Sequence, residues 1–427
     1  MKLPGGAVTA LGITQLVGWG TTFYIPAVLG HTMAADAGWS TSEVFGAFSC
    51  SLLVAGAVSK RIGHAIDLRG ARAVMSTGSI GVVLGLLMLA SASHWIQLFL
   101  AWTLLGVASR ATQYDAAFAA IAALTGAGAR RAISMITLWG GLASSVFWPL
   151  GHLLDETLGW RWTVAIYALV NLVICLPLHL RFASARRTSA VPTDPREERP
   201  GTQSTAVPPT PAPNPASPAA ATPASGPPAA VQGALHGPER ERALLVFAVV
   251  LSAFSFVFSC VAAHMITLLQ GLGLAAATAV GLSSIMGIAQ VGARFLEMTA
   301  QRWFAPMSIG VIALALLPVS LTVMLAAGAA PTAIAAACVI YGAAIGLVTV
   351  VRGAVPLVLF GHAGYATTLG RIAAPGLATA ALAPLLFDWI LGTLGAHGAL
   401  VLLLAIALTS LAGMLWLARQ QVGASST

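Results

Sequence analysis

Long apolar segments, each of about 20 residues, follow one another along most of this 427-residue sequence. A helix of that length crosses the roughly 30 Å hydrocarbon core of a bilayer, because each residue adds about 1.5 Å. In lipid the backbone polar groups must pair within the segment, which requires helices. Only 8% of the residues are charged, against about a quarter in soluble domains. The sequence therefore predicts an all-α, polytopic membrane protein.

Six apolar spans precede residue 184 and six follow residue 240. The predicted spans are 6–30, 41–62, 73–93, 95–124, 131–155, 161–183, 242–269, 275–298, 306–328, 332–358, 367–392 and 396–418. The stretch between the halves holds 13 of the 23 prolines and few large apolar residues, so burial cannot offset its ordering entropy. We predict an N-terminal six-helix bundle over 1–183, a disordered Pro/Ala-rich cytoplasmic linker over 184–240, and a C-terminal six-helix bundle with a short tail over 241–427.

The net charge of +8 reflects basic residues gathered on one side of the predicted membrane. That side holds Lys60, Arg61, Arg69, Arg72, Arg130, Arg131, the linker arginines, Arg302 and Arg419. This is the positive-inside pattern and not a phosphate-binding stripe. We expect cytoplasmic N- and C-termini, a place in the bacterial inner membrane, and no nucleic-acid partner.

A short polar stretch, "GHAIDLRGAR" at residues 63–72, separates the second and third spans. In this place it resembles the signature loop of the major facilitator superfamily, whose pattern is roughly G-x-x-x-D-[RK]-x-G-x-[RK]. Gly63, Asp67, Gly70 and Arg72 match, while Leu68 stands where a basic residue is usual. The resemblance in architecture covers nearly the whole chain except the linker. It implies twelve transmembrane helices in two pseudo-symmetric six-helix bundles.

We interpret this loop as a conformational latch. Gly63 has no side chain, which lets a neighbouring helix approach the end of the second span. Asp67 is expected just before the third span, where a helix's positive end favours a carboxylate. The resemblance implies that Asp67 also contacts the start of the eleventh span and steadies the outward-open state, with Arg371 as candidate partner. The alternative is a solvated basic loop that only sets topology.

The second-half counterpart of the loop, "ARFLEMTAQRW" at 293–303, is degenerate. Glu297 and Arg302 are the candidates for its acid and its base, but the register is not fixed. We therefore expect a single latch, on the first half.

Arg110 is the leading candidate for substrate contact, because ionisable residues inside the bilayer are costly and tend to be functional. It lies near the middle of the fourth span, and Thr103 and Tyr114 are expected on the same helix face. The resemblance implies that spans 1, 4, 7 and 10 line a central cavity. A permanent guanidinium there suits a carboxylate. The alternative is an internal ion pair with Asp115 or with another helix.

The tenth span repeats this pattern, with Tyr341, Thr349 and Arg352 on one expected face. Arg352 and Asp115 lie at similar depths in the two halves. We predict a cross-half ion pair that opens and closes during transport. Exchanging the two charges should then restore what each single change destroys.

Two further polar stripes supply substrate-binding candidates, although such a stripe faces either a cavity or a partner helix. They comprise Gln15, Trp19 and Thr22 in the first span and Ser252, Ser255 and Ser259 in the seventh. His264, in the outer part of the seventh span, and Asp115 are the candidates for proton coupling. An unperturbed histidine titrates near pH 6.5, and a packing role for His264 is the alternative.

The stretch "GIAQVGAR" in the eighth span is similar to the G-x-x-D-x-x-x-R of monocarboxylate transporters, through Gly287 and Arg294. In that family the arginine binds the carboxylate and the aspartate takes part in proton coupling. Here Gln290 replaces the aspartate and cannot titrate. Arg294 is a further substrate-binding candidate, and a position close to the cytoplasmic end would argue against contact with substrate.

These patterns predict a secondary transporter that moves a small, monocarboxylate-like organic anion by alternating access, as a symporter or an antiporter. The resemblance to the major facilitator superfamily implies proton coupling, which is common in that superfamily. The runner-up is efflux of a drug-like or toxic compound, a metalloid included. We expect a monomer whose partners are its substrate, the lipid bilayer and protons.

Other classes of function lack their signals. The four cysteines are isolated, so neither a metal nor a disulfide is expected. A channel would need rings of charge. We find no H-E-x-x-H, G-x-S-x-G or Walker motif, so we expect no enzyme and no cofactor.

Overall fold

The computed structural model of the chain describes residues 5–182 and 235–426, and it contains no strand in these ranges. The first half comprises α1 (Gly5–Gly18), η1 (Trp19–Phe23), α2 (Ile25–Ala37), α3 (Thr41–Arg69), α4 (Ala71–Ala90), α5 (Trp95–Thr112), α6 (Tyr114–Thr125), η2 (Gly126–Gly128), α7 (Ala129–Gly141), α8 (Ala143–Leu158), α9 (Trp160–Val170), η3 (Asn171–Cys175) and α10 (Leu176–Phe182). The second half comprises α11 (Gly237–Gly271), α12 (Ala276–Ala300), α13 (Pro306–Ala327), α14 (Pro331–Phe360) and α15 (Tyr365–Ser426).

Nine helical segments of the described ranges are long and apolar enough to cross a membrane. The first and fourth spans are each divided into shorter helices, and α15 holds two spans, which brings the total to the predicted twelve. At about 1.5 Å per residue, the 62 residues of α15 far exceed one bilayer. The chain turns at Gly395, whose φ of 65° lies in the left-handed region that favours glycine.

Most of the predicted linker, residues 183–234, lies outside the described residues. Helix α11 begins at Gly237, so the last residues of the range predicted as linker are helical.

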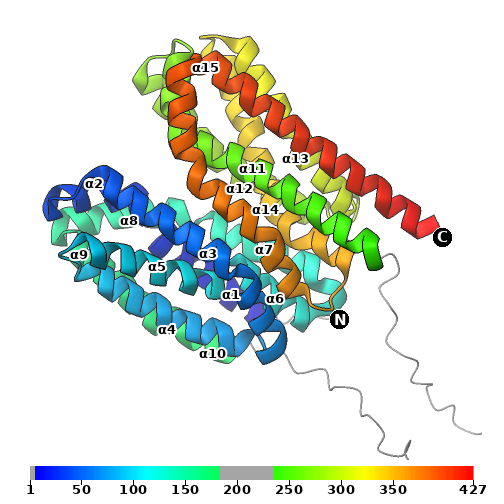
Figure 1. Ribbon diagram of the computed structural model, residues 1–427, viewed down its shortest axis with the longest axis horizontal. Coiled ribbons are helices and arrows are strands. Elements are labelled where there is room, and N and C mark those ends of the chain that lie inside the picture. Colours follow the sequence, from blue (N-terminus) through cyan, green and yellow to red (C-terminus); the bar gives the residue numbers. More distant parts are fainter. Residues whose placement is uncertain (1–4, 183–234, 427) are drawn as a thin grey trace, which may run out of the picture.

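The two halves form two bundles that meet at one end and diverge toward the other, as Figure 1 shows for the blue-to-cyan and green-to-red helices. We call the shared end the basic end; it carries Arg69, Arg72, Arg130, Arg131 and Arg302. One buried cluster there joins residues of the first half, such as Ile66 and Phe118, to Leu357 and Leu369 of the second. Elsewhere each half has its own core.

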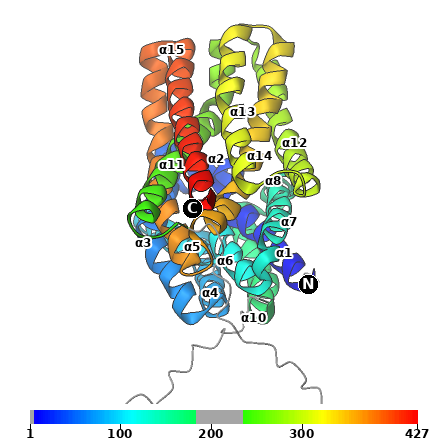
Figure 2. The ribbon, with the colours of Figure 1, turned by 90° about the vertical axis from the view of Figure 1, so that its right-hand side faces the viewer.

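Helices α3 and α7 of the first half meet α15, α12 and α14 of the second (Figure 2). These contacts place the start of α15 and the end of α14 against the first half. Polar residues of the interface lie on these helices and on α6, which carries Asp115.

Two spans contain a π-helical turn, η1 in the first and η3 in the sixth. A hydrogen bond joins these turns: the buried amide of Asn171 donates to Thr21 Oγ1 at 2.8 Å and to the Tyr167 carbonyl at 2.8 Å. Turns of this kind recur at functional sites because they redirect side chains.

Candidate functional site

Glycines allow α3 and α15 to cross at backbone contact. A Cβ added to Gly63 would lie 2.2 Å from the Ala366 carbonyl oxygen, and one on Gly370 would lie 2.3 Å from that of Ser59. Each glycine lies on a different half, so the contact tightens the interface from both sides. The close approach expected at Gly63 is present.

Asp67 joins the end of α3 to the start of α15. Its carboxylate accepts hydrogen bonds from the backbone N–H of Ala366 at 3.2 Å and of Thr367 at 2.8 Å, and from the Thr367 hydroxyl at 2.6 Å. These are first-turn N–H groups, which have no partner inside their own helix. Asp67 therefore stabilises the N-terminal end of α15. The prediction that Asp67 lies just before the third span, at the N-terminal end of that helix, was wrong, because α3 continues to Arg69 and Asp67 lies in its last turn.

Arg371 is not the partner of Asp67. Its guanidinium donates to both carboxylate oxygens of Glu241, at 3.0 and 2.6 Å, within the second half. The main chain of α15 already supplies the donors for Asp67, which leaves no need for an arginine. Gly70 ends α3 with a φ of 83°, and the side chain of Arg72 is exposed.

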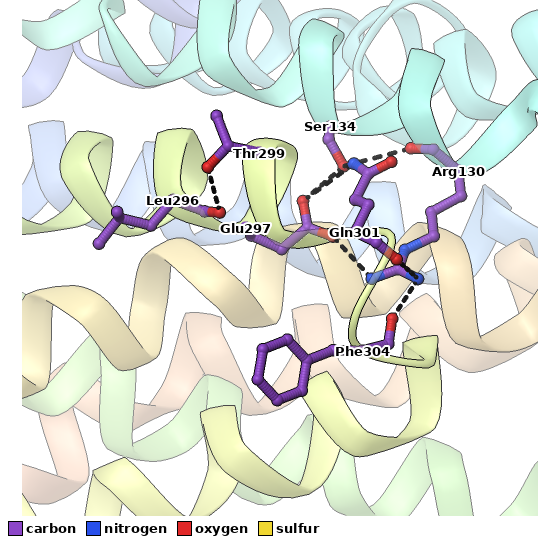
Figure 3. Close-up of polar contacts among 7 residues, drawn as sticks. All are labelled: Arg130, Ser134, Leu296, Glu297, Thr299, Gln301 and Phe304. Carbon is purple, nitrogen blue, oxygen red and sulfur yellow. Dashed lines mark hydrogen bonds and ion pairs between the residues drawn. The ribbon is translucent and has the colours of Figure 1, made fainter.

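A second polar contact crosses the interface between α12 and α7 (Figure 3). Glu297 accepts from Arg130 Nη2 at 3.1 Å, from the Ser134 hydroxyl at 2.7 Å and from Gln301 Nε2 at 3.3 Å. Its side chain is fully buried. Arg130 also donates to the carbonyls of Gln301 and Phe304 at 3.3 and 2.6 Å, so it is bound to both ends of the turn that follows α12.

The expectation of a single contact of this kind was therefore wrong. Asp67 comes from the second span of the first half and contacts the start of the fifth span of the second half. Glu297 comes from the second span of the second half and contacts the start of the fifth span of the first half. The two acids are related by the pseudo-symmetry of the bundles, and the degenerate sequence around Glu297 hid this relation.

Asp115 lies between two arginines near the middle of the interface. It accepts from Arg110 Nη2 at 2.5 Å within the first half and from Arg352 Nη2 at 2.7 Å across the halves. The predicted cross-half pair is present, and so is the internal pair that was the alternative for Arg110. Two guanidiniums face one carboxylate, which leaves one positive charge without a partner at this point.

The fourth span is broken next to this cluster. Helix α5 ends at Thr112 and α6 begins at Tyr114, with Gln113 in an extended conformation. Tyr114 therefore does not share one continuous helix face with Arg110 and Thr103. Its hydroxyl donates to the Thr137 carbonyl at 3.4 Å.

Arg294 reaches across the interface from α12 toward α7. It is 4% exposed, and it donates to the carbonyls of Thr137 and Gly346 at 3.0 and 3.3 Å and to the Thr349 hydroxyl at 3.1 Å. Among the residues that the structure describes, no carboxylate lies within ion-pairing distance of it. Its charge is stabilised by neutral oxygens alone, although its position is inside the interface and not at the surface of the basic end.

A cavity that is open to solvent lies beside this cluster. The predicted residues that line it are Trp19, Thr22, Arg110, Tyr114 and Arg352. Its other lining residues include Phe23, Phe48, Trp102 and Gln113. The arginines come from the basic side of the cavity, and Phe48 and Trp102 lie closer to the opposite end of their helices. The cavity can therefore take an acidic group at one end and an apolar body at the other.

Five of the predicted substrate residues do not line the cavity, Arg294 among them. Gln15 is buried and donates to the Thr112 carbonyl at 2.9 Å, which satisfies the broken end of α5. Tyr341 is in the core of the second half, with its hydroxyl 3.4 Å from the Val257 carbonyl. Ser255 lies against Gly376 of α15, and Ser259 is not among the lining residues of the cavity. Small polar side chains on apolar helices here serve helix contacts.

His264 lies in the second half, near the end of α11 that is farther from Asp67. Its Nε2 is 3.7 Å from Asp388 Oδ1, and its ring contacts Phe387 edge to face. Both partners belong to its own half, so a proton on His264 would act inside one bundle.

The chain matches the family model described as the Major Facilitator Superfamily over residues 10–374. This chain belongs to the major facilitator superfamily. Among solved structures, it is similar to the human organic anion transporter MFSD10 (TETRAN), at 14% identity and a TM-score of 0.69, covering 97% of this chain and 100% of that one. It is also similar to the proton:xylose symporter XylE bound to 6-bromo-6-deoxy-D-glucose, at 12% identity and a TM-score of 0.68, covering 96% and 95%.

At these identities the solved structures show the fold. No curated protein matches the chain at a significant level. Membership of the major facilitator superfamily indicates an integral multi-pass membrane protein that acts as a secondary transporter of a small molecule, and it points away from an enzyme. No cluster of three or more potential metal ligands occurs within residues 5–182 and 235–426.

Several residues that line the cavity were not predicted from the sequence. Phe23, Phe48 and Trp102 read as ordinary apolar positions in their spans, and nothing in the sequence distinguishes them from core aromatics. Asn171 carried a signal, since an amide in the middle of an apolar span costs free energy unless it is hydrogen-bonded.

Replacing Gly63 with alanine should weaken the contact between the halves, because the added methyl group meets backbone that cannot rotate away. We expect a cost of about 1–3 kcal/mol to the closed basic end. Faster hydrogen–deuterium exchange in a peptide that covers residues 361–372 would show that the contact between the halves is weaker. Gly292→Ala is the control, because nothing lies within 4 Å of its added Cβ. Equal exchange in both variants would show that the contact does not hold this end closed.

Proposed function

We propose that the chain is a secondary transporter for a small organic anion of the monocarboxylate type. The observation that carries this proposal is the excess of arginine inside the interface. Arg110, Arg294 and Arg352 converge on it, and Asp115 is the one carboxylate that pairs with any of them among the described residues. Uncompensated buried charge is costly, and an anionic ligand would supply the missing counter-charge.

The proposal assigns the transport cycle to the polar contacts between the halves. Asp67 and Glu297 act as two latches that hold the basic end closed. We place the protein in the inner membrane of a bacterium, with the basic end facing the cytoplasm. The units that move are the bundles of residues 1–183 and 241–427, in a monomer. Opening the basic end must break both latches and the bond between Asp115 and Arg352, since all of them cross the interface.

Proton coupling, by symport or antiport, is part of the proposal, with Asp115 and His264 as the candidate carriers. Asp115 contacts both halves, so its charge bears on the equilibrium between open and closed states. His264 pairs within one half. A proton on Asp115 would weaken its hold on Arg352 and favour opening.

Uptake of labelled acetate, lactate and pyruvate into liposomes tests the proposal. We expect saturable exchange, and a loss of at least about tenfold in Arg352→Gln, because Arg352 lines the cavity and a charge-assisted hydrogen bond to a ligand contributes about 1.5–3 kcal/mol. Arg419→Gln is the control, since this residue is exposed at the end of α15. Unchanged uptake in Arg352→Gln would contradict the assignment.

Export of a drug-like compound is the second candidate, favoured by the aromatic side chains of the cavity. The local excess of positive charge opposes lipophilic cations, which narrows this candidate to neutral or acidic compounds. Competition of such compounds with labelled acids would separate the two functions.

A further inference from the structure

Five aromatic rings form one continuous wall of the cavity. In order along the wall they are Trp102, Phe48, Phe23, Trp19 and Tyr114, with successive centroids 5.3, 5.5, 5.0 and 5.1 Å apart. All five line the cavity. Ring contacts at these separations are favourable when the rings meet edge to face or at a tilt, so the wall is a preassembled surface.

The two central rings of this wall lie on the π-helical turn of the first span. Trp19 and Phe23 are the first and last residues of η1. Asn171 of the other π-helical turn donates to Thr21 inside η1. Gly20 lets the turn approach Phe147, since a Cβ there would lie 2.2 Å from that ring. Residues outside the cavity therefore hold the irregular backbone of η1 in place. This backbone in turn positions the side chains of Trp19 and Phe23.

One positive group lies at the basic side of the wall. Arg352 lines the cavity, and its side chain is 28% exposed. Among the described residues, Asp115 alone accepts a hydrogen bond from it. A guanidinium has five N–H donors, so most of its donors are available to a ligand. Arg110 is 7% exposed and is engaged with the same carboxylate.

We propose that the cavity binds an organic anion with a flat aromatic body: its acidic group meets Arg352, and its ring lies against Trp19, Phe23 and Phe48, the partly exposed rings of the wall. This inference rests on the proposed anion transport and narrows its substrate class. A short aliphatic acid satisfies the arginine and leaves the aromatic wall unused. An aromatic acid satisfies both the arginine and the aromatic wall.

Equilibrium binding of labelled phenylacetate and of labelled acetate to the purified full-length protein tests the inference. We expect phenylacetate to bind at least about tenfold more tightly, because each aromatic contact is worth roughly 2- to 10-fold in affinity. Phe23→Leu and Phe48→Leu remove one ring each and keep an apolar side chain, so both should lower phenylacetate affinity by about three- to tenfold and leave acetate affinity within about twofold. Phe254→Leu is the control, since Phe254 stacks on Phe258 within the second half.

The outcomes separate this inference from the proposed function. Equal affinity for the two acids, or equal loss for both acids in the leucine variants, would overturn the aromatic class and leave anion transport standing. Binding of neither acid, together with binding of a neutral aromatic probe such as phenylacetamide, would overturn both. Loss of both acids in Arg352→Gln, with loss of phenylacetate alone in the two leucine variants, is the result that supports the whole assignment.

Discussion

Asp115→Asn is expected to open the basic end and to lower the melting temperature of the protein. The change leaves Arg110 and Arg352 facing each other with no carboxylate between them, where Asp115 now accepts from both at 2.5 and 2.7 Å. Breaking a buried ion pair in this way costs about 3–5 kcal/mol. Because the two arginines belong to different halves, their repulsion is relieved when the halves separate. We expect a shift of about 100-fold toward the open state.

Hydrogen–deuterium exchange of the start of α15, in a peptide over residues 361–372, measures this shift. The control is Glu156→Gln, whose side chain is 63% exposed and pairs only with the exposed His152; it should behave as the parent. A stable Asp115→Asn protein with parental exchange would show that the cluster does not hold the halves together.

The charge exchange between Asp115 and Arg352 is no longer a clean test of their pairing. The structure adds Arg110 as a third member, so an arginine introduced at position 115 would face Arg110. The appropriate double variant is Asp115→Asn with Arg352→Gln, which removes one positive charge together with the carboxylate. We expect it to recover most of the stability lost by Asp115→Asn alone.

Glu297→Gln should have the second large effect. The fully buried carboxylate accepts from Arg130, Ser134 and Gln301, and the amide that replaces it can accept at only one atom and brings two donors. Arg130 would lose its ion pair while it stays partly buried. We expect a cost of about 3 kcal/mol or more to the closed basic end, seen as faster exchange in a peptide over residues 126–137.

A double-mutant cycle with Arg130→Gln tests this pairing. Each single variant leaves one charge without its partner, whereas the double variant removes both, so its cost should be well below the sum of the two single costs. Additive costs would mean that the bond in Figure 3 contributes nothing to the closed state.

The sequence by itself determined the class of fold, because every span must satisfy its own backbone in lipid. The apolar runs gave the twelve crossings with ends that differ from the structure by a few residues, except where α2, α3, α11 and α15 extend five to eight residues past the predicted spans. The loop at residues 63–72 led to Asp67 and to its contact with the start of the eleventh span, because that contact is tied to a short local pattern.

Only the tertiary structure decided which polar residues meet. Gln15, Tyr341 and Ser255 obey the same helical periodicity as Trp19 and Thr22, yet they pack against other helices, and periodicity does not say which neighbour a face will meet. The contacts of Arg371 with Glu241, of Glu297 with Ser134 and of Asp115 with Arg352 each join residues more than 100 positions apart. The contact of Asp115 with Arg110 crosses a helix break. Such contacts depend on how the two bundles pack against each other, and no local sequence pattern determines that packing.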